Sequence, residues 1–230
     1  MRLLLALFLG LGWLRAAEPA PTLADVVAEL DVKWPKNRTI HLVCHGHSVP
    51  AGYFKTPEVR ADEAYPALLQ AGLRRRHPQA VLNVIVTAVG GENSVSGAAR
   101  FERDVLALRP RVVSIDYSLN DRRLGLEKAR VAWTQMIVAA KAAGVRVILL
   151  TPTPDQGARW DDPQDPLNLH AEQVRALARE HGALLVDSLA LFKAKVAAGT
   201  PLPGLMSQGN HPNAAGHALV GEGLLALFDR

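Results

Sequence analysis

The sequence has little of several features that would define other classes of protein. Cysteine occurs once, at Cys44, so no intramolecular disulfide can form and the fold must rely on a hydrophobic core. Aromatic residues are only 5% of the chain, which argues against a base-stacking nucleic-acid surface. The formal net charge of +4 includes Arg2 and Arg15, so no polyanionic partner is indicated. What remains is the composition of a globular protein of 230 residues, enough for one domain.

Long apolar runs are also scarce, and the clearest one lies at the N-terminus. Residues 3–14 are almost all apolar, follow Arg2, and precede Ala16 and Ala17. The run is short for a membrane span and is typical of a secretory signal peptide, with an uncleaved anchor as the alternative. We therefore expect export to the periplasm or the medium, without stable membrane insertion after cleavage. The predicted organisation is a signal peptide, a linker with a short helix, and one domain, at residues 1–17, 18–37 and 38–230.

Within the domain, apolar runs alternate with amphipathic stretches. The runs are rich in Val, Ile and Leu, which is typical of strands buried on both faces. The predicted strands are Ile40–Cys44, Leu82–Val86, Val112–Asp116, Val145–Leu150 and Ala183–Val186. The predicted helices cover residues 61–76, 96–108, 125–143, 166–181, 188–198 and 213–228. This alternation predicts an α/β protein of three layers, α/β/α, with a five-stranded doubly wound parallel sheet.

Chemically suggestive segments follow the strands. Ser48 comes shortly after the first strand, Gly91 after the second and Asn120 after the third, while His211 precedes the last helix. Ligands of such sheets bind beyond the carboxyl ends of the strands, so we expect these residues to meet at one edge. The long polar loop 151–166 is a further candidate to face a substrate.

These residue types suit hydrolysis of an ester. A serine hydroxyl attacks a carbonyl once a base takes its proton, and His211 is the candidate base for Ser48. The oxyanion that forms needs preorganised donors, and the backbone N–H groups of Ser48 and Gly91 and the side-chain amide of Asn120 are candidates. The alternative, non-catalytic roles are a helix-capping serine for Ser48, a capping or surface histidine for His211, and turn residues for Gly91 and Asn120.

The same residues resemble four sequence blocks of the SGNH hydrolase superfamily, the GDSL-type lipases and esterases. The blocks are similar to Gly46-His47-Ser48, Val89-Gly90-Gly91-Glu92-Asn93-Ser94, Ser118-Leu119-Asn120-Asp121 and Gln208-Gly209-Asn210-His211-Pro212-Asn213. The resemblance covers roughly residues 39–228 and implies a flavodoxin-like sheet, a serine nucleophile and no cofactor. It also implies the roles proposed above for Ser48, Gly91, Asn120 and His211.

Three positions depart from the family pattern. His47 and Gln208 stand where the family usually has Asp, and Ser118 where it usually has Gly. The family Asp at 208 would orient the histidine, so we expect a Ser48–His211 dyad instead. Its support would come from the Gln208 amide oxygen, a backbone carbonyl or a carboxylate of another loop. The candidate carboxylates are Asp121, Asp161 and Asp162, although Asp121 reads more readily as structural. Glu92 and His47 are further candidates to orient the base or line the pocket, and a solvated side chain is the alternative for Glu92.

The favoured function is an exported serine esterase that forms an acyl-enzyme and removes short acyl groups, such as acetyl, from carbohydrate. The partner is thus a small-molecule or carbohydrate ester, with no nucleic acid, and the oligomeric state is left open. Lysophospholipid and thioester substrates remain alternatives. A metal-dependent hydrolase using His45 and His47, and a glycan-binding module with a retired active site, are rivals from other classes.

Overall fold

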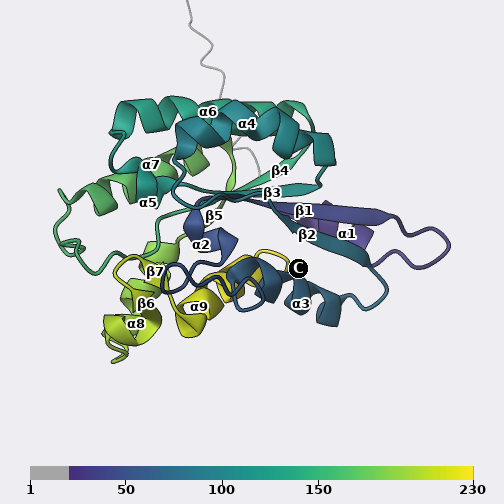
Figure 1. Ribbon diagram of the computed structural model, residues 1–230. Coiled ribbons are helices and arrows are strands. Elements are labelled where there is room, and N and C mark those ends of the chain that lie inside the picture. Colours follow the sequence, from purple (N-terminus) through teal and green to yellow (C-terminus); the bar gives the residue numbers. More distant parts are fainter. Residues whose placement is uncertain (1–20, 230) are drawn as a thin grey trace, which may run out of the picture.

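The computed structural model describes residues 21–229 of the chain, and a five-stranded parallel sheet runs through its centre (Figure 1). The strand order is β2-β1-β3-β4-β5, the flavodoxin-like order of a doubly wound sheet. The fold predicted from the alternating pattern is therefore confirmed. The strands are β1 (Thr39–Gly46), β2 (Val81–Val86), β3 (Val112–Asp116), β4 (Arg146–Leu150) and β5 (Leu184–Val186).

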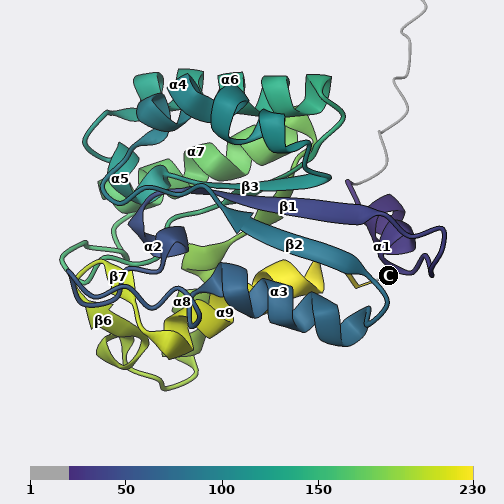
Figure 2. The ribbon, with the colours of Figure 1, turned by 45° about the vertical axis from the view of Figure 1, so that its right-hand side comes forward.

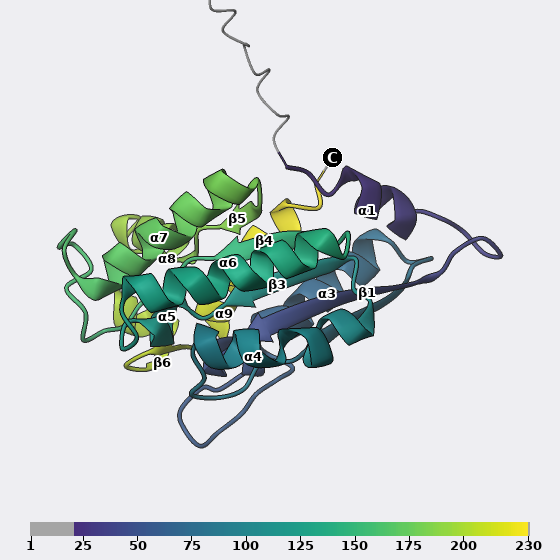
Figure 3. The same cartoon turned by 90° about the horizontal axis from the view of Figure 1, so that it is seen from above.

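Helices cover both faces of the sheet. One face, the upper in Figure 1, carries α4 (Ser94–Asp104), α6 (Leu126–Ala142) and α7 (Pro166–His181). The other carries α1 (Ala24–Leu30), α3 (Tyr65–Arg76), α8 (Ser188–Ala197) and α9 (Ala214–Ala226). Figure 2 shows α3 and α9 below the sheet, and the view from above in Figure 3 shows α6 lying along it. The result is a sandwich of three layers.

Successive strand residues feed two separate cores. In β1, Val43 joins the core beneath α4 and α6, while Leu42 and Cys44 join the core on the α3 and α9 side. The same alternation holds in β4, where Val147 and Leu149 face one core and their neighbours face the other. Because side chains alternate across a strand, a continuous apolar run fills both faces, as the sequence pattern predicted.

Helix ends follow local chemistry. The helix α7 begins after Asp165, whose carboxylate accepts the Leu167 N–H at 2.9 Å, and ends at Gly182, whose φ is +56°. The helix predicted from residue 61 begins only at Tyr65, because Pro66 suits the first helical turn and marks the start. The helix predicted over 96–108 divides into α4 and a 3₁₀ turn, η1 (Leu106–Leu108).

Short elements that the sequence pattern did not predict gather where the strands end. They are α2 (Ser48–Ala51), α5 (Ser118–Asp121), the 3₁₀ turn η2 (Leu202–Leu205) and the hairpin of β6 (Met206–Gln208) and β7 (His211–Pro212). In Figure 1 the helices α2 and α5 and the hairpin lie at the left of the sheet. This edge is where ligands of such folds bind.

The N-terminal segment contributes to the core where it is described. Leu23, Val26, Val27 and Leu30 are buried on or beside α1 and pack into the cluster on the α3 side. The predicted signal peptide, residues 1–17, lies outside the described residues. Among residues 21–229, no helix is both long enough and apolar enough to cross a bilayer.

Candidate active site

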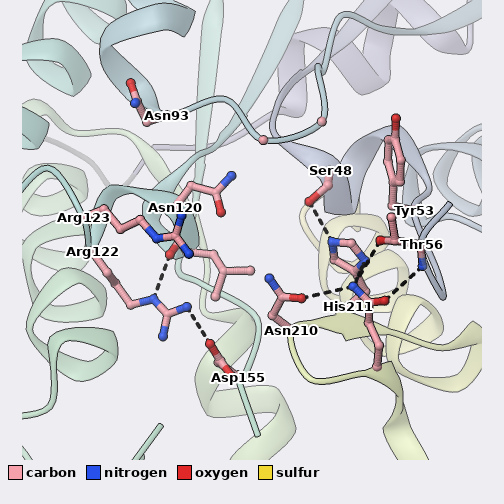
Figure 4. A pocket seen from close by; sticks show the side chains of 14 residues that line it. Ser48, Tyr53, Thr56, Asn93, Asn120, Arg122, Arg123, Asp155, Asn210 and His211 are labelled. Atoms are coloured by element: carbon pink, nitrogen blue, oxygen red, sulfur yellow. Dashed lines mark hydrogen bonds and ion pairs between the residues drawn. The ribbon is translucent and has the colours of Figure 1, made fainter. Parts of the chain in front are cut away.

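Ser48 is presented by the turn from β1 into α2. The turn needs Gly46, because a Cβ there would lie 2.4 Å from the Asp116 carbonyl oxygen on the neighbouring strand. His47 then caps α2, its Nδ1 accepting the Val49 N–H at 3.2 Å. Ser48 is consequently the first residue of a helical turn, with its hydroxyl at the wall of the pocket (Figure 4).

His211 meets Ser48 from the β6–β7 hairpin. The ring Nε2 lies 2.9 Å from Ser48 Oγ, and Nδ1 lies 2.8 Å from the backbone carbonyl oxygen of Phe54. A carbonyl only accepts, so this contact favours the tautomer with the proton on Nδ1. In that tautomer Nε2 is a free acceptor for the Ser48 hydroxyl proton, which is the arrangement a general base requires.

Gln208 is held differently from the expectation. Its amide oxygen accepts the Thr56 N–H at 2.9 Å instead of a ring proton of His211. Its amide nitrogen lies 3.2 Å from Thr56 Oγ1, 3.3 Å from Asn210 Oδ1 and 2.9 Å from His211 Nδ1. Since Nδ1 carries a proton when it donates to Phe54, the two amide hydrogens are left for Thr56 and Asn210. The acceptor on Nδ1 is thus a backbone carbonyl, one of the three supports expected for the dyad.

No expected carboxylate reaches His211 within residues 21–229. Asp121 accepts the Ser94 N–H at 2.8 Å and the Trp133 indole N–H at 2.7 Å, so it ties α5 to α4 and α6. Asp162 accepts the Gln164 N–H and pairs with Arg159. Asp161 is exposed in the same loop and makes no contact with His211. The structural reading of Asp121 is the one that its contacts support.

Burial sets the protonation of the candidate base. His211 is 5% exposed, and burial lowers its pKa below the ordinary 6.5. The contact with the Phe54 carbonyl raises the pKa and the nearby His47 lowers it further, but burial is the larger cause. A lowered pKa keeps the imidazole neutral at pH 7, so its Nε2 stays able to accept a proton.

The three residues predicted to supply oxyanion donors, Ser48, Gly91 and Asn120, line the same pocket. Gly91 has a φ of +80°, and a Cβ there would meet nothing within 4 Å, so glycine serves the backbone and leaves the pocket open. Within the described chain, the backbone N–H groups of Ser48 and Gly91 have no protein acceptor. Asn120 donates one amide hydrogen to the Glu92 carbonyl at 2.8 Å, which leaves the other for a ligand.

The Glu92 side chain does not line the pocket, contrary to one of its predicted roles. Its carboxylate pairs with the Arg100 guanidinium at 2.5 Å and lies 3.5 Å from the Tyr117 hydroxyl. Only its carbonyl bears on the site, through Asn120. The ion pair fixes the loop that carries Gly91 onto α4.

The histidines considered for a metal site are occupied in other ways. The ring nitrogens of His45 lie 2.8 Å from Thr87 Oγ1 and 3.2 Å from the Gly97 carbonyl, and burial lowers the pKa of this histidine to about 4. His47 is buried behind Ser48, with Nε2 3.4 Å from Asp116 Oδ1. Across residues 21–229, no group of three or more His, Cys, Asp or Glu is arranged to hold a metal ion.

Two buried groups near the site have plain structural explanations. Burial raises the pKa of the Cys44 thiol to about 12, so it is an unreactive apolar side chain. His217 accepts the Tyr65 N–H at 3.3 Å, and its ring stacks on Phe54 with centroids 5.1 Å apart. His217 thereby supports the residue whose carbonyl contacts His211.

The pocket has a volume of about 860 Å³ and a mostly polar wall. Several lining residues were not predicted from the sequence, because polar side chains in loops carry no pattern that distinguishes them from solvated ones. They are Tyr53, Thr56, Asn93, Arg122, Arg123 and Asn210, several of which Figure 4 shows around Ser48 and His211; Asp155, which also lines the pocket, comes from the loop 151–166 that the sequence analysis named as a candidate to face a substrate. Among residues 21–229, Leu119 is the single aliphatic side chain in the wall.

A flavodoxin-like sheet with a hydrogen-bonded serine and histidine and converging donors at its carboxyl edge is the arrangement of an SGNH-type ester hydrolase. Residues 44–219 match the GDSL-like Lipase/Acylhydrolase family, and the chain belongs to that family. It is accordingly a carboxylic ester hydrolase. The alternative hypothesis of a non-catalytic binding module is therefore rejected.

Individual relatives agree with the family. The chain is 24% identical over 174 residues to an acetylxylan esterase of Geobacillus stearothermophilus, covering 70% of this chain and 78% of the relative. A structure of a catalytic mutant of an acetylxylan esterase from that organism superposes with a TM-score of 0.72 at 22% identity, over 87% of this chain and 97% of the other. An α/β hydrolase enzyme from the metagenome of Lake Arreo, Spain, gives a TM-score of 0.71 at 24% identity, over 82% and 94%.

The comparison with this relative also bears on Gln208, which stands where the family usually has Asp. Structures of the Geobacillus stearothermophilus esterase described as catalytic mutants replace a serine, an aspartate or a histidine, and that aspartate precedes the histidine by three residues. The same spacing separates Gln208 from His211 here. Where the relative has a carboxylate at this spacing, this chain has an amide.

Proposed function

We propose that the protein hydrolyses short-chain esters, such as acetyl groups on carbohydrate, through an acyl-enzyme on Ser48. The observation that carries this proposal is the polar wall of the pocket, in which Leu119 is the only aliphatic side chain from the described part of the chain. A sugar presents hydroxyl groups that Asn, Gln, Thr and Arg side chains can bind, whereas a long acyl chain needs an apolar channel. The similarity to an acetylxylan esterase supports the same substrate class.

In this proposal, His211 and Ser48 act as a dyad. The Ser48 hydroxyl attacks the ester carbonyl as His211 Nε2, 2.9 Å away, takes its proton. The ring is held by its Nδ1–H, which donates to the Phe54 carbonyl and strengthens this bond as the imidazolium forms. His211 then protonates the leaving alcohol, and a water molecule, deprotonated by the same nitrogen, hydrolyses the acyl-enzyme.

Charge on the tetrahedral intermediate falls on the former carbonyl oxygen. The Ser48 and Gly91 N–H groups and the free amide hydrogen of Asn120 would donate to it. Removing one such donor typically costs about 2.7–4 kcal/mol of transition-state stabilisation. These donors are held in place before substrate binds, so little reorganisation accompanies the reaction.

The test compares acyl-chain lengths and substrates. Release of nitrophenol from nitrophenyl acetate should exceed release from nitrophenyl palmitate by at least about 100-fold, because the polar pocket cannot desolvate a long chain. Acetate should also be released from acetylated xylo-oligosaccharides. Ser48→Ala is the control and should lose both activities and its labelling by a fluorophosphonate probe. A preference for palmitate would favour a lysophospholipase, and loss of activity with a chelator a metal enzyme.

Export is part of the same proposal. The apolar run at residues 3–14 after Arg2 supports a signal peptide that is removed after Ala16 or Ala17. N-terminal sequencing of the protein from the periplasm or medium of an expressing bacterium tests this. Recovery of the intact N-terminus in the cytoplasm, or in the membrane, would contradict it.

A further inference from the structure

The side chains that line the pocket carry a net positive charge. Two arginines, Arg122 and Arg123, and one carboxylate, Asp155, line the cavity that holds Ser48 and His211. Asn93, Asn120, Asn210, Gln208 and Thr56 supply neutral polar groups. With His211 neutral, the wall carries one more positive charge than negative charges.

The single carboxylate is already paired. Arg122 Nη2 lies 2.6 Å from Asp155 Oδ2, and Arg122 Nε donates to the Leu119 carbonyl at 2.8 Å. Asp155 also accepts the Gly157 N–H at 2.9 Å. Figure 4 shows this pair across the cavity from His211. Asp155 and Arg122 therefore neutralise each other and fix the lower wall of the pocket.

Arg123 has no such partner. Its side chain is exposed, and within residues 21–229 it makes no ion pair and no side-chain hydrogen bond. Its backbone is anchored beside the site, because its N–H donates to the Asn120 carbonyl at 3.3 Å. A free guanidinium thus follows the proposed oxyanion donor by three positions, on the same turn of chain and in the same cavity (Figure 4).

We propose that Arg123 binds an anionic substituent of the substrate, the carboxylate of an acidic sugar or a phosphate on a sugar. This inference rests on the proposed function, since the ester and the anion are taken to belong to one molecule. A guanidinium presents a planar fork of donors that matches both carboxylate and phosphate. Because Asp155 is paired with Arg122, the described residues that line the pocket include no unpaired carboxylate to repel such a group.

Binding without turnover is the first test. Methyl glucuronide, methyl glucoside and glucose 6-phosphate carry no ester, so titration of the intact enzyme with each reports binding alone. The acidic ligands should bind about tenfold more tightly than the neutral glucoside, corresponding to roughly one charge-assisted contact in a partly exposed site. A preference for only one of the two acidic ligands would identify carboxylate or phosphate as the group recognised.

Two matched substitutions assign the effect. Arg123→Gln should reduce the ratio of acidic to neutral affinity to near one. Arg75→Gln removes the same charge from the exposed surface of α3, outside the pocket, and should leave the ratio unchanged. Equal affinity of all three ligands for the wild type, or equal loss of preference in the two variants, would overturn the proposal.

Kinetics then connect the subsite to the reaction. The kcat/KM for an acetylated methyl glucuronide should exceed that for an acetylated methyl glucoside by a similar factor, and added salt should reduce the difference. If neither ester is cleaved but the anion still binds through Arg123, the proposed function fails while the subsite stands. If both esters are cleaved equally and the anions do not bind preferentially, the subsite fails while the function stands.

Discussion

The two sides of the pocket are built from different chemistry. On the side of the proposed oxyanion donors, carboxylates hold the loops in place: Asp121 binds the start of α4, and Glu92 pairs with Arg100 beneath the Gly91 loop. On the side of His211, the acceptor for the ring Nδ1 proton is the Phe54 backbone carbonyl, and the side chain beside the ring is the neutral amide of Gln208. In this protein an uncharged backbone carbonyl orients the candidate base, whereas charged carboxylates fix the loops that carry Gly91 and Asn120.

The largest effect should come from removing the base. His211→Ala is expected to lower kcat on nitrophenyl acetate by at least about 10⁴-fold, because among residues 21–229 only His211 hydrogen-bonds to the Ser48 hydroxyl. Ser48→Ala should lose about as much, and the double variant should be no worse than either single one. Losses that multiply in the double variant would show that the two residues do not act as a unit.

Next comes the amide on the opposite wall. Asn120→Ala should lower kcat by about 10²–10³-fold with a much smaller change in KM, since an oxyanion donor acts mainly in the transition state. Asn120→Asp keeps the shape but presents a carboxylate, and should be at least as damaging. A change in KM alone would indicate that Asn120 binds substrate rather than the oxyanion.

The carboxylate support can be probed through stability. Asp121→Asn keeps the shape, but its NH₂ group faces one of two donors, Ser94 N–H or the Trp133 indole N–H. We expect the free energy of unfolding to fall by about 1–3 kcal/mol, the usual penalty for a buried donor left unpaired. Urea unfolding measures this. An unchanged urea midpoint would mean that the contacts of Asp121 with Ser94 and Trp133 do not stabilise the fold around Asn120.

The smallest effect should come from replacing Gln208. This substitution tests whether His211 is oriented by the Phe54 carbonyl without help from the side chain at position 208. Gln208→Ala should lower kcat less than about tenfold, because the Phe54 carbonyl still accepts the Nδ1 proton. Equal losses for Gln208→Ala and His211→Ala would place the support of the ring in the amide instead.

Position 208 should also control the pH profile. Burial lowers the pKa of His211, so the acid limb of kcat/KM should have its midpoint below pH 6.5, with activity falling as pH drops through that midpoint. Gln208→Glu puts a negative charge beside the ring, favours the imidazolium, and should move the limb to higher pH. A limb that stays in place would show that the side chain at 208 is electrostatically remote from the base.

Sequence and structure agree best where a pattern repeats. The strands are predicted to within two residues, because Val, Ile and Leu at successive positions are needed to fill two cores at once. The four-residue helices α2 and α5 were missed, since an element of about one turn shows no periodicity. The four proposed catalytic and oxyanion residues do meet at one edge, because the order of strands brings the ends of β1, β2 and β3 together.

The partner of His211 lay beyond sequence prediction for a physical reason. Every residue carries a carbonyl, so nothing about the identity of Phe54 marks it as the acceptor. Only the path of the chain from 52 to 60, braced by the Phe54 N–H on the Glu58 carbonyl and by the stack on His217, brings that carbonyl to the ring.

That path gives the protein an unusual pattern of mutational tolerance. A catalytic aspartate is lost by a single codon change, whereas a main-chain oxygen survives every substitution at its position. The orientation of His211 therefore depends on the length of the loop more than on the identity of one side chain. The Arg60 N–H donates to the Gly52 carbonyl at 2.8 Å and closes the loop, so an insertion or deletion between these residues would displace the Phe54 carbonyl. Diversification of this enzyme should therefore accept varied side chains at the exposed positions 55–59 of that loop, retain the Phe54 ring that stacks on His217, and reject changes in the number of residues.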